Sequence, residues 1–267
     1  WTNSNKDVSI KFSNILDTLD GLDAEFSYYG TGGTLEFLTQ DEQHKIHVTA
    51  RTSNGNYSKT FQGLNHNDHN TASTGRIMMI QGLVSNETYR TAYGGFNPTN
   101  ASITVEYELI DSNGSSIGST FTRSFSAHQY IGFSPFNEAG LPYPTYSYDN
   151  VWLKITPVSG SGELMSYGAT ANNNTNDPAV HNAVQAADIG GYNSPSSYQV
   201  IPEVLWAPAS GVGTWMTEVK ITDITGDSEV SVYFNSITGD RRGPFDVFTG
   251  SRSGAGIKIE NVLNAIG

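Results

Sequence analysis

A short motif occurs three times in the chain, at intervals of domain size. It joins a strand-like stretch to a short helical stretch, and its copies are residues 10–19, 131–140 and 257–267. The copies begin 121 and 126 residues apart in a chain of 267 residues. A chain of this length can hold one large domain or two of about 130 residues, each with its own core. The repeat predicts related units of the smaller size.

Residues that begin and end helices predict a short helix in each copy of the motif. In the middle copy Ser134 suits the N-cap, Pro135 the first helical position and Gly140 the left-handed position that ends a helix. In the first copy Ser13 and Gly21 can act as cap and stop. Closely matching punctuation at domain-sized spacing is an unlikely result of chance.

The remaining segments predict strands and also repeat. Residues 88–97 resemble residues 214–223, a displacement of 126. Apolar and polar residues alternate over 102–110 and again over 229–234, as in half-buried strands. Further strands are expected at 24–29, 34–39, 44–52, 77–83, 117–126, 150–156, 164–170, 200–206 and 243–249.

Turn residues separate these strands. Hairpin turns are expected at 111–114, 159–162 and 238–240. The ending at 50–56 matches the ending at 168–174, and each leads into a polar stretch, 54–75 or 171–197, that we expect to be a surface loop.

Seven or eight short strands per unit, with turns every 8–12 residues, are typical of a β-sandwich. The predicted class is all-β, with antiparallel sandwich repeats of Ig-like or jelly-roll-like type and few helices. We expect a complete unit at 73–190, the second half of a unit at 1–72 and the first half of a unit at 191–267.

Composition narrows the partners and the cellular location. A net charge of −12 argues against binding to a phosphate backbone, which needs clustered Lys and Arg. No apolar run of 18 residues is present to span a membrane. The chain has no cysteine and is rich in Asn, Ser and Thr, which favours an exported protein. Because it begins with Trp1 rather than Met, we expect that a signal peptide has been removed.

Motifs for catalysis are missing from the sequence. It has no Gly-x-Ser-x-Gly nucleophile elbow and no glycine-rich phosphate loop. The pairs Glu218 and Glu229, or Asp17 and Asp20, have no neighbours that would raise a carboxyl pKa. We therefore expect no enzyme activity and no catalytic residue.

Metal ligands are sparse. His66, Asp68 and His69 have ligand-like spacing but fall short of a preformed site. Residues 111–115 and 223–227 offer oxygen ligands without the length or distal Glu of an EF-hand loop. We expect no resident cofactor, with calcium the one candidate.

Two kinds of surface feature are candidates for contact or modification. Tyr143, Tyr146 and Tyr148 form an aromatic loop that could stack on sugar rings or on a neighbouring subunit. Packing over the end of the sandwich is the alternative. Sequons that would accept N-linked glycans stand at Asn56, Asn86, Asn100, Asn113 and Asn173.

The segment Trp215-Met216-Thr217-Glu218 and the Asn97-Pro98 turn carry a family resemblance. They resemble tandem β-sandwich modules of secreted and cell-surface bacterial proteins, in which a Trp-x-Thr-Asp-type strand precedes an Asn-Pro turn. The likeness covers about 70 residues twice, and the sequence departs from it at Tyr89, Ala92 and Asp223-Ile224. Such modules are mostly architectural or adhesive, so the resemblance implies no catalytic residue.

Half a sandwich at each end leaves unpaired strand edges, which soluble proteins avoid. We expect the halves to complete each other, either within one chain or between neighbouring copies. The third alternative is that the sequence is an excerpt of a longer tandem array. The leading hypothesis is an extracellular structural protein that forms a head-to-tail filament or surface layer by exchanging β-structure. The alternative is a cell-surface adhesin or carbohydrate-binding module closed in cis. The expected assembly residues are Ile10, Phe12, Ile15, Leu16, Leu19, Ile257, Ile259, Val262, Leu263 and Ile266.

Overall fold

The computed structural model describes residues 11, 34–37, 47–54, 57–64, 71–185, 206–208, 214–216, 218–222, 229–236, 240–249 and 255–265. The chain forms two compact units, Trp1–Gln40 and Asp41–Gly267. In the first, residues 34–37 have exposed side chains and no regular secondary structure, although a strand was expected there.

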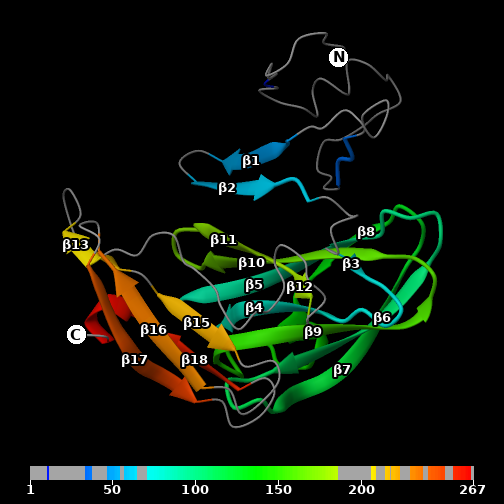
Figure 1. Ribbon diagram of the computed structural model, residues 1–267. Helices are drawn as coiled ribbons and strands as arrows, with labels where there is room; N and C mark the ends of the chain where they lie inside the picture. The colour runs from blue at the N-terminus through cyan, green and yellow to red at the C-terminus, as the bar shows by residue number, and fades with distance from the viewer. Residues whose placement is uncertain are drawn as a thin grey trace. The chain divides into compact units, whose positions relative to one another are not determined.

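Residues 71–185 form a sandwich of two antiparallel five-stranded sheets (Figure 1). The first sheet has the order β11-β10-β5-β8, with β3 also paired to β10. The second has the order β12-β4-β9-β6-β7. The strands of the first sheet are β3 (Thr71–Ala72), β5 (Tyr89–Phe96), β8 (Tyr130–Phe133), β10 (Leu164–Asn172) and β11 (Pro178–Asn182). Those of the second are β4 (Met78–Ser85), β6 (Ile103–Ile110), β7 (Ser116–Phe125), β9 (Tyr148–Gly160) and β12 (Val184–Gln185).

The core of the sandwich follows from period-two alternation. In β6 the residues Ile103, Val105, Tyr107 and Leu109 are at most 1% exposed, and the residues between them are half-buried. They pack in one cluster with apolar residues of β4, β5, β9 and β10. The predicted all-β sandwich is therefore confirmed.

One buried polar chain crosses this core. The Tyr107 hydroxyl donates to the Tyr93 hydroxyl at 2.9 Å, and Tyr93 lies 2.7 Å from the Ser166 hydroxyl. The chain joins β6 of one sheet to β5 and β10 of the other. Because each hydroxyl has a partner, the cost of burying it is offset.

The helix of the sandwich is α2 (Pro135–Glu138), which the sequence correctly predicted. Ser134 is the N-cap and its side chain accepts a hydrogen bond from the Asn137 amide. Pro135 stands at the first helical position, and Gly140 has a φ of 77°.

The two stretches expected to be loops contain strands, which corrects that expectation. β1 (Thr49–Asn54) and β2 (Tyr57–Gln62) form an antiparallel hairpin in which Asn54 lies opposite Tyr57. The second stretch contains β11 and β12. Edge strands of this kind have one exposed face, so their sequences carry few apolar residues to identify them.

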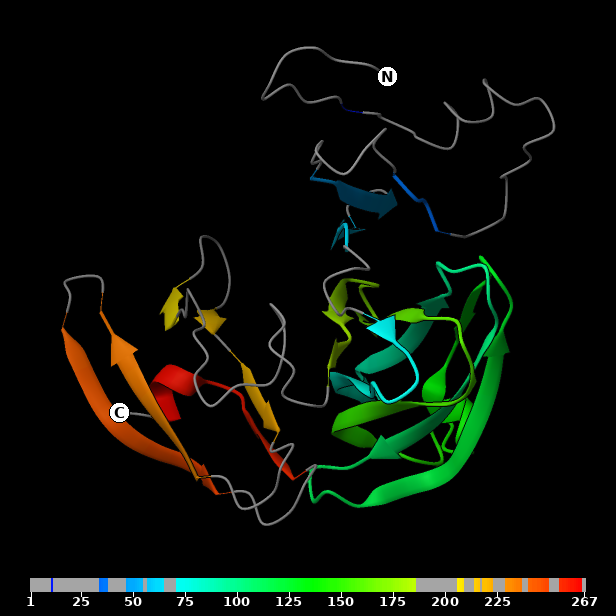
Figure 2. The ribbon, with the colours of Figure 1, turned by 45° about the vertical axis from the view of Figure 1, so that its right-hand side comes forward.

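The C-terminal strands pair two by two (Figures 1 and 2). β18 runs on into α3, the only helix besides α2 in the described part of the chain (Figure 2). The pairs are β13 (Trp206–Pro208) with β14 (Thr214–Met216), β15 (Val219–Thr222) with β18 (Gly256–Ile259), and β16 (Glu229–Asn235) with β17 (Arg241–Thr249), and α3 covers Val262–Ala265.

Candidate functional site

The pair β15–β18 repeats the pair β5–β8 with an unchanged register. In the sandwich Tyr93 lies opposite Phe133, and 126 residues later Val219 lies opposite Ile259. The same displacement relates the other three pairs of β15 and β18 to those of β5 and β8. The two strand pairs therefore have the same antiparallel register.

The pair β16–β17 resembles β6–β7 at both ends and at the turn, while the partners of Ser231 and Val232 are offset by one residue. The Asp111 carboxylate accepts a hydrogen bond from the Ser115 amide at 2.9 Å. At a displacement of 125 residues, the Ser236 hydroxyl accepts one from the Asp240 amide at 3.0 Å. α3 repeats α2 in a similar way, because the Asn261 side chain accepts from the Asn264 amide at 3.1 Å.

We call β15, β16, β17, β18 and α3 together the C-terminal half-unit, because the described residues show no counterpart of β9 or β10 paired with it. In the sandwich β5 lies between β8 and β10, and β6 lies between β7 and β9. Among the described residues, β15 pairs only with β18, and β16 only with β17. One edge of β15 and one edge of β16 therefore present unpaired backbone groups in the described structure.

The apolar residues of β6 and β16 differ in burial. The inward residues of β6 are fully buried. In β16 the corresponding apolar residues Val230, Val232 and Phe234 are only half-buried. The apolar face of the half-unit is thus incompletely covered by the described residues.

The hairpin β1–β2 resembles the last hairpin of the sandwich. Ala50 pairs with Phe61 across β1 and β2, and Gly168, 118 residues after Ala50, pairs with His181 across β10 and β11. β10 also pairs with β5 along its other edge, whereas β1 has no second partner among the described residues.

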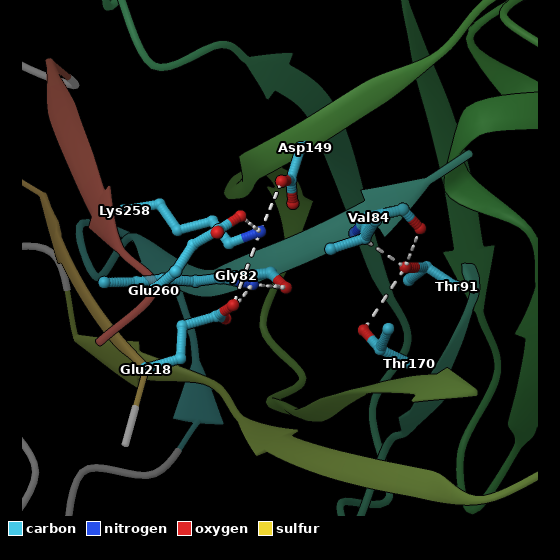
Figure 3. A network of polar contacts seen from close by, with 9 residues as sticks. Gly82, Val84, Thr91, Asp149, Thr170, Glu218, Lys258 and Glu260 are labelled. Carbon is cyan, nitrogen blue, oxygen red and sulfur yellow. Dashed lines mark hydrogen bonds and ion pairs between the residues drawn. The ribbon is translucent and has the colours of Figure 1, made fainter. Parts of the chain in front are cut away.

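A lysine cluster holds the half-unit against the second sheet of the sandwich (Figure 3). Lys258 on β18 places its Nζ 2.5 Å from Asp149 Oδ2, 3.3 Å from Glu218 Oε2 and 3.5 Å from Glu260 Oε1. Lys220 on β15 donates to the Gly82 carbonyl at 3.1 Å. These contacts join β15 and β18 to β4 and β9.

The electrostatics of the cluster favour charged lysine. Burial alone would lower the pKa of Lys258, but the hydrogen bond to Asp149 and the charges of Glu218 and Asp149 raise it above its ordinary value. Nearby, burial and the charge of Lys220 lower the pKa of His181, whose Nε2 is buried and has no hydrogen-bond partner among the described residues. Sequence reasoning missed this cluster.

A signal for the cluster was present in the repeat. Lys220 and Lys258 lie opposite each other on β15 and β18, and their counterparts in the sandwich are Gly94 and Gly132. A Cβ at Gly94 would lie 2.5 Å from the Tyr167 ring, so the sandwich has no room for a side chain there. Two lysines in place of two glycines mark a surface with a different use.

Part of the expected assembly set can be placed. Ile257, Ile259 and Leu263 are half-buried, and Val262 is 5% exposed. The others lie outside the described residues: Ile10, Phe12, Ile15, Leu16, Leu19 and Ile266.

The aromatic loop divides into two parts. Tyr143 is 45% exposed and Tyr146 is 42% exposed. Tyr148 is half-buried on β9, and its ring lies 6.0 Å from that of the buried Phe136. Tyr143 and Tyr146 are therefore the members with free surface.

The asparagines of the sequons differ in their hydrogen bonds and exposure. The Asn173 amide group donates to the carbonyls of Asn86 and Glu87, and the Asn86 side chain accepts from the amides of Thr88 and Tyr89. Asn100 and Asn113 are exposed, with Asn100 Oδ1 2.9 Å from His128 Nε2, and Asn56 lies outside the described residues.

The structure describes only one of the candidate metal-binding stretches, residues 111–115. His66, Asp68, His69 and residues 223–227 lie outside the described residues. Asp111 Oδ1 accepts from the Asn113 and Ser115 amides, so that oxygen serves the hairpin turn. In the part of the chain that the structure describes, no three His, Asp or Glu side chains are grouped so that they could hold a metal ion.

Comparison with protein-family models, with curated proteins and with solved structures gave no match. The resemblance to tandem surface modules therefore stays a prediction. None of the described helices has the length and apolar character needed to cross a membrane.

Proposed function

We propose that this chain is a structural subunit of an extracellular filament or surface layer, assembled head to tail by exchange of β-structure. The half-unit of one copy would be completed by N-terminal segments of the next. The observation that supports this most strongly is that β15 and β18 keep the register of β5 and β8, while no counterpart of β9 or β10 pairs with β15 or β16 among the described residues.

The physical reason is the cost of an incomplete sheet. An unpaired edge exposes backbone donors and acceptors, and a half-covered apolar face remains in contact with water. Adding a strand removes both costs, because main-chain hydrogen bonds give affinity and side-chain pockets give register. When the completing strands come from another copy, the same contact repeated along the chain gives an open polymer.

The test is the state of assembly in the purified full chain. Electron microscopy and sedimentation over a dilution series should find polymers whose length depends on concentration. Phe234→Glu places a charge on the half-buried face of β16 and should shorten or abolish them, whereas Asn235→Glu at the exposed neighbouring position should leave them intact. A monomer at all concentrations would overturn the proposal.

A second candidate is a glycan-binding adhesin closed in cis. The exposed rings of Tyr143 and Tyr146 favour it, because aromatic faces stack on sugars. Binding to a glycan array that is lost in Tyr143→Ala and Tyr146→Ala chains, with assembly unchanged, would support this function. Absence of binding by the unmodified chain would argue against it.

A further inference from the structure

The short described segment of the first unit carries two exposed apolar side chains. In Thr34–Phe37, Leu35 is 39% exposed and Phe37 is 45% exposed. They alternate with Thr34 and Glu36, which is the pattern of a strand with one apolar face. The segment has strand-like sequence and no strand structure.

The segment matches β9 at the displacement that relates β1 to β10. With a displacement of 118 residues, Leu35 corresponds to Leu153 and Phe37 corresponds to Ile155. Leu153 and Ile155 are both 0% exposed in the sandwich. The same displacement takes Ala50 of β1 to Gly168 of β10. One displacement therefore gives the counterparts of both β9 and β10, the two strands that do not appear beside β16 and β15 in the described structure.

From this match, and resting on the proposed head-to-tail assembly, we propose the register in which a second copy completes the half-unit. In the sandwich β9 lies antiparallel to β6, with Leu153 opposite Leu109 and Ile155 opposite Tyr107. Transferred to the half-unit, Leu35 of the second copy lies opposite Phe234, and Phe37 lies opposite Val232. Residues 34–37 thus form the strand beside β16.

Charge complementarity supports this register. The outward pair between β6 and β9 is Glu108 and Lys154, whose charged groups lie 3.2 Å apart. The transferred pair is Tyr233 and Glu36. The guanidinium carbon of Arg241 lies 3.9 Å from the centre of the Tyr233 ring, so a cation again stands beside the carboxylate.

The second open edge gives an independent match. In the sandwich Ala92 of β5 lies opposite Ala169 of β10, and Thr91 lies opposite Thr170. Glu218, the residue before β15, transfers opposite Arg51 of β1. This pair joins opposite charges, which is favourable across a strand pair.

Contacts within one chain favour a second copy as the source of these strands. β2 contacts the first sheet of the sandwich, where the Phe61 ring lies 5.4 Å from that of Tyr167 on β10. The half-unit is held by Asp149 and Gly82, which belong to the second sheet. The hairpin thus packs on the first sheet, whereas the ion pair to Asp149 and the hydrogen bond to Gly82 tie the half-unit to the second sheet.

The chain has no cysteine, so single cysteines give a clean test of the register. Glu36→Cys chains are mixed under mild oxidation with chains carrying Tyr233→Cys, Ser231→Cys or Asn235→Cys. All three partner positions are exposed, so folding should be retained and is checked by circular dichroism. Only Tyr233→Cys lies directly opposite, and it should form the mixed disulfide about tenfold faster than the other two, because disulfides need Cβ atoms about 4 Å apart.

The outcomes separate the register from the assembly. Polymers in electron micrographs together with fastest cross-linking at position 231 or 235, or no preference, would overturn the register and leave the proposed function standing. Chains that remain monomeric would overturn the proposed function itself. A disulfide within a single chain of the double variant would show closure in cis and overturn the role of a second copy.

Discussion

The sandwich and the C-terminal half-unit share one strand register, that of β5 with β8 and of β15 with β18, but differ in how completely their strands are paired. In the sandwich β5 and β6 are each paired on both edges, and Leu109 is 1% exposed. In the half-unit β15 and β16 each have one partner among the described residues, and Phe234, the counterpart of Leu109, is half-buried. Backbone pairing between two neighbouring strands is therefore encoded locally, whereas burial depends on strands that come from elsewhere.

The side chains of the two regions differ in the same sense. The buried hydroxyl chain of the sandwich uses Tyr93 and Tyr107, whose counterparts in the half-unit are Val219 and Val232. Buried hydroxyls need fixed partners, which a complete core can supply. Apolar valines place no such demand on the strands that cover them.

The largest expected difference between the two regions is the cost of losing a core side chain. Leu109→Ala removes a fully buried side chain and should lower the free energy of unfolding by about 2–5 kcal/mol. Phe234→Ala should cost unassembled chains much less, because that side chain is already half in water. Urea unfolding followed by circular dichroism measures both. Equal losses in unassembled chains would mean that the half-unit is already complete.

The second expected effect concerns the hydroxyl chain that the half-unit lacks. Tyr93→Phe leaves the buried Tyr107 and Ser166 hydroxyls without that partner, at a cost of about 1–3 kcal/mol. The matched control is Tyr130→Phe, whose hydroxyl lies 3.1 Å from that of Tyr167 at a partly exposed site. Water can replace that contact, so its loss should be smaller in the same unfolding experiment.

The same tyrosines should make the stability of the sandwich depend on pH in the alkaline range. Burial raises the pKa of both Tyr93 and Tyr107 above its ordinary value of about 10. A raised folded-state pKa contributes stability that is present below about pH 10 and is lost as pH rises toward the folded value. Unfolding free energies measured from pH 8 to pH 11 should therefore fall above pH 10, and less steeply in Tyr93→Phe. An identical slope in both chains would contradict this origin.

The sequence predicted the features that depend on local pattern. β6 and β16 follow from alternation, and α2 follows from Ser134, Pro135 and Gly140. It failed for β2 and β11, whose exposed faces leave little apolar signal. Local pattern is sufficient where the residues that form an element also stabilise it.

The candidate site was less predictable for a physical reason. The lysine cluster brings together residues far apart in the sequence, among them Gly82, Asp149 and Lys258, and no local pattern records that proximity. The hydroxyl chain likewise joins Tyr93 to Tyr107 and Ser166 on three strands. The sequence did contain one signal for the cluster: Lys220 and Lys258 stand where the sandwich has Gly94 and Gly132.

A smaller effect is expected from the lysine cluster itself. Lys258→Met removes the charge at the centre of three carboxylates and should loosen the half-unit from the sandwich by about 1 kcal/mol, typical of partly exposed ion pairs. Faster hydrogen exchange at the β18 amides would report this, and the effect should shrink at high salt. Lys154→Met breaks an ion pair inside the sandwich and serves as the control. If both variants accelerate exchange at β18 equally, the cluster is not what holds the half-unit.

The smallest expected effect comes from the two helix caps, which compare the regions at matched positions. Ser134→Ala and Asn261→Ala each remove a side-chain acceptor, and such losses cost about 0.5–2 kcal/mol, with the low end expected here for helices of four residues. The two losses should differ in whether they lower the stability of the whole chain or only that of the helix. Phe136 of α2 is 1% exposed in the core, so losing the Ser134 cap should lower global stability in urea.

The Asn261 cap should act only locally, because α3 belongs to a half-unit whose face is incompletely covered. Its loss should accelerate hydrogen exchange at the Ala265 amide, which donates to the Asn261 carbonyl, and leave global unfolding unchanged. Asn261→Ser keeps a capping oxygen and should restore slow exchange. If Asn261→Ala instead lowers global stability as much as Ser134→Ala does, the half-unit and the sandwich unfold as one cooperative body, and the half-unit is stable without added strands.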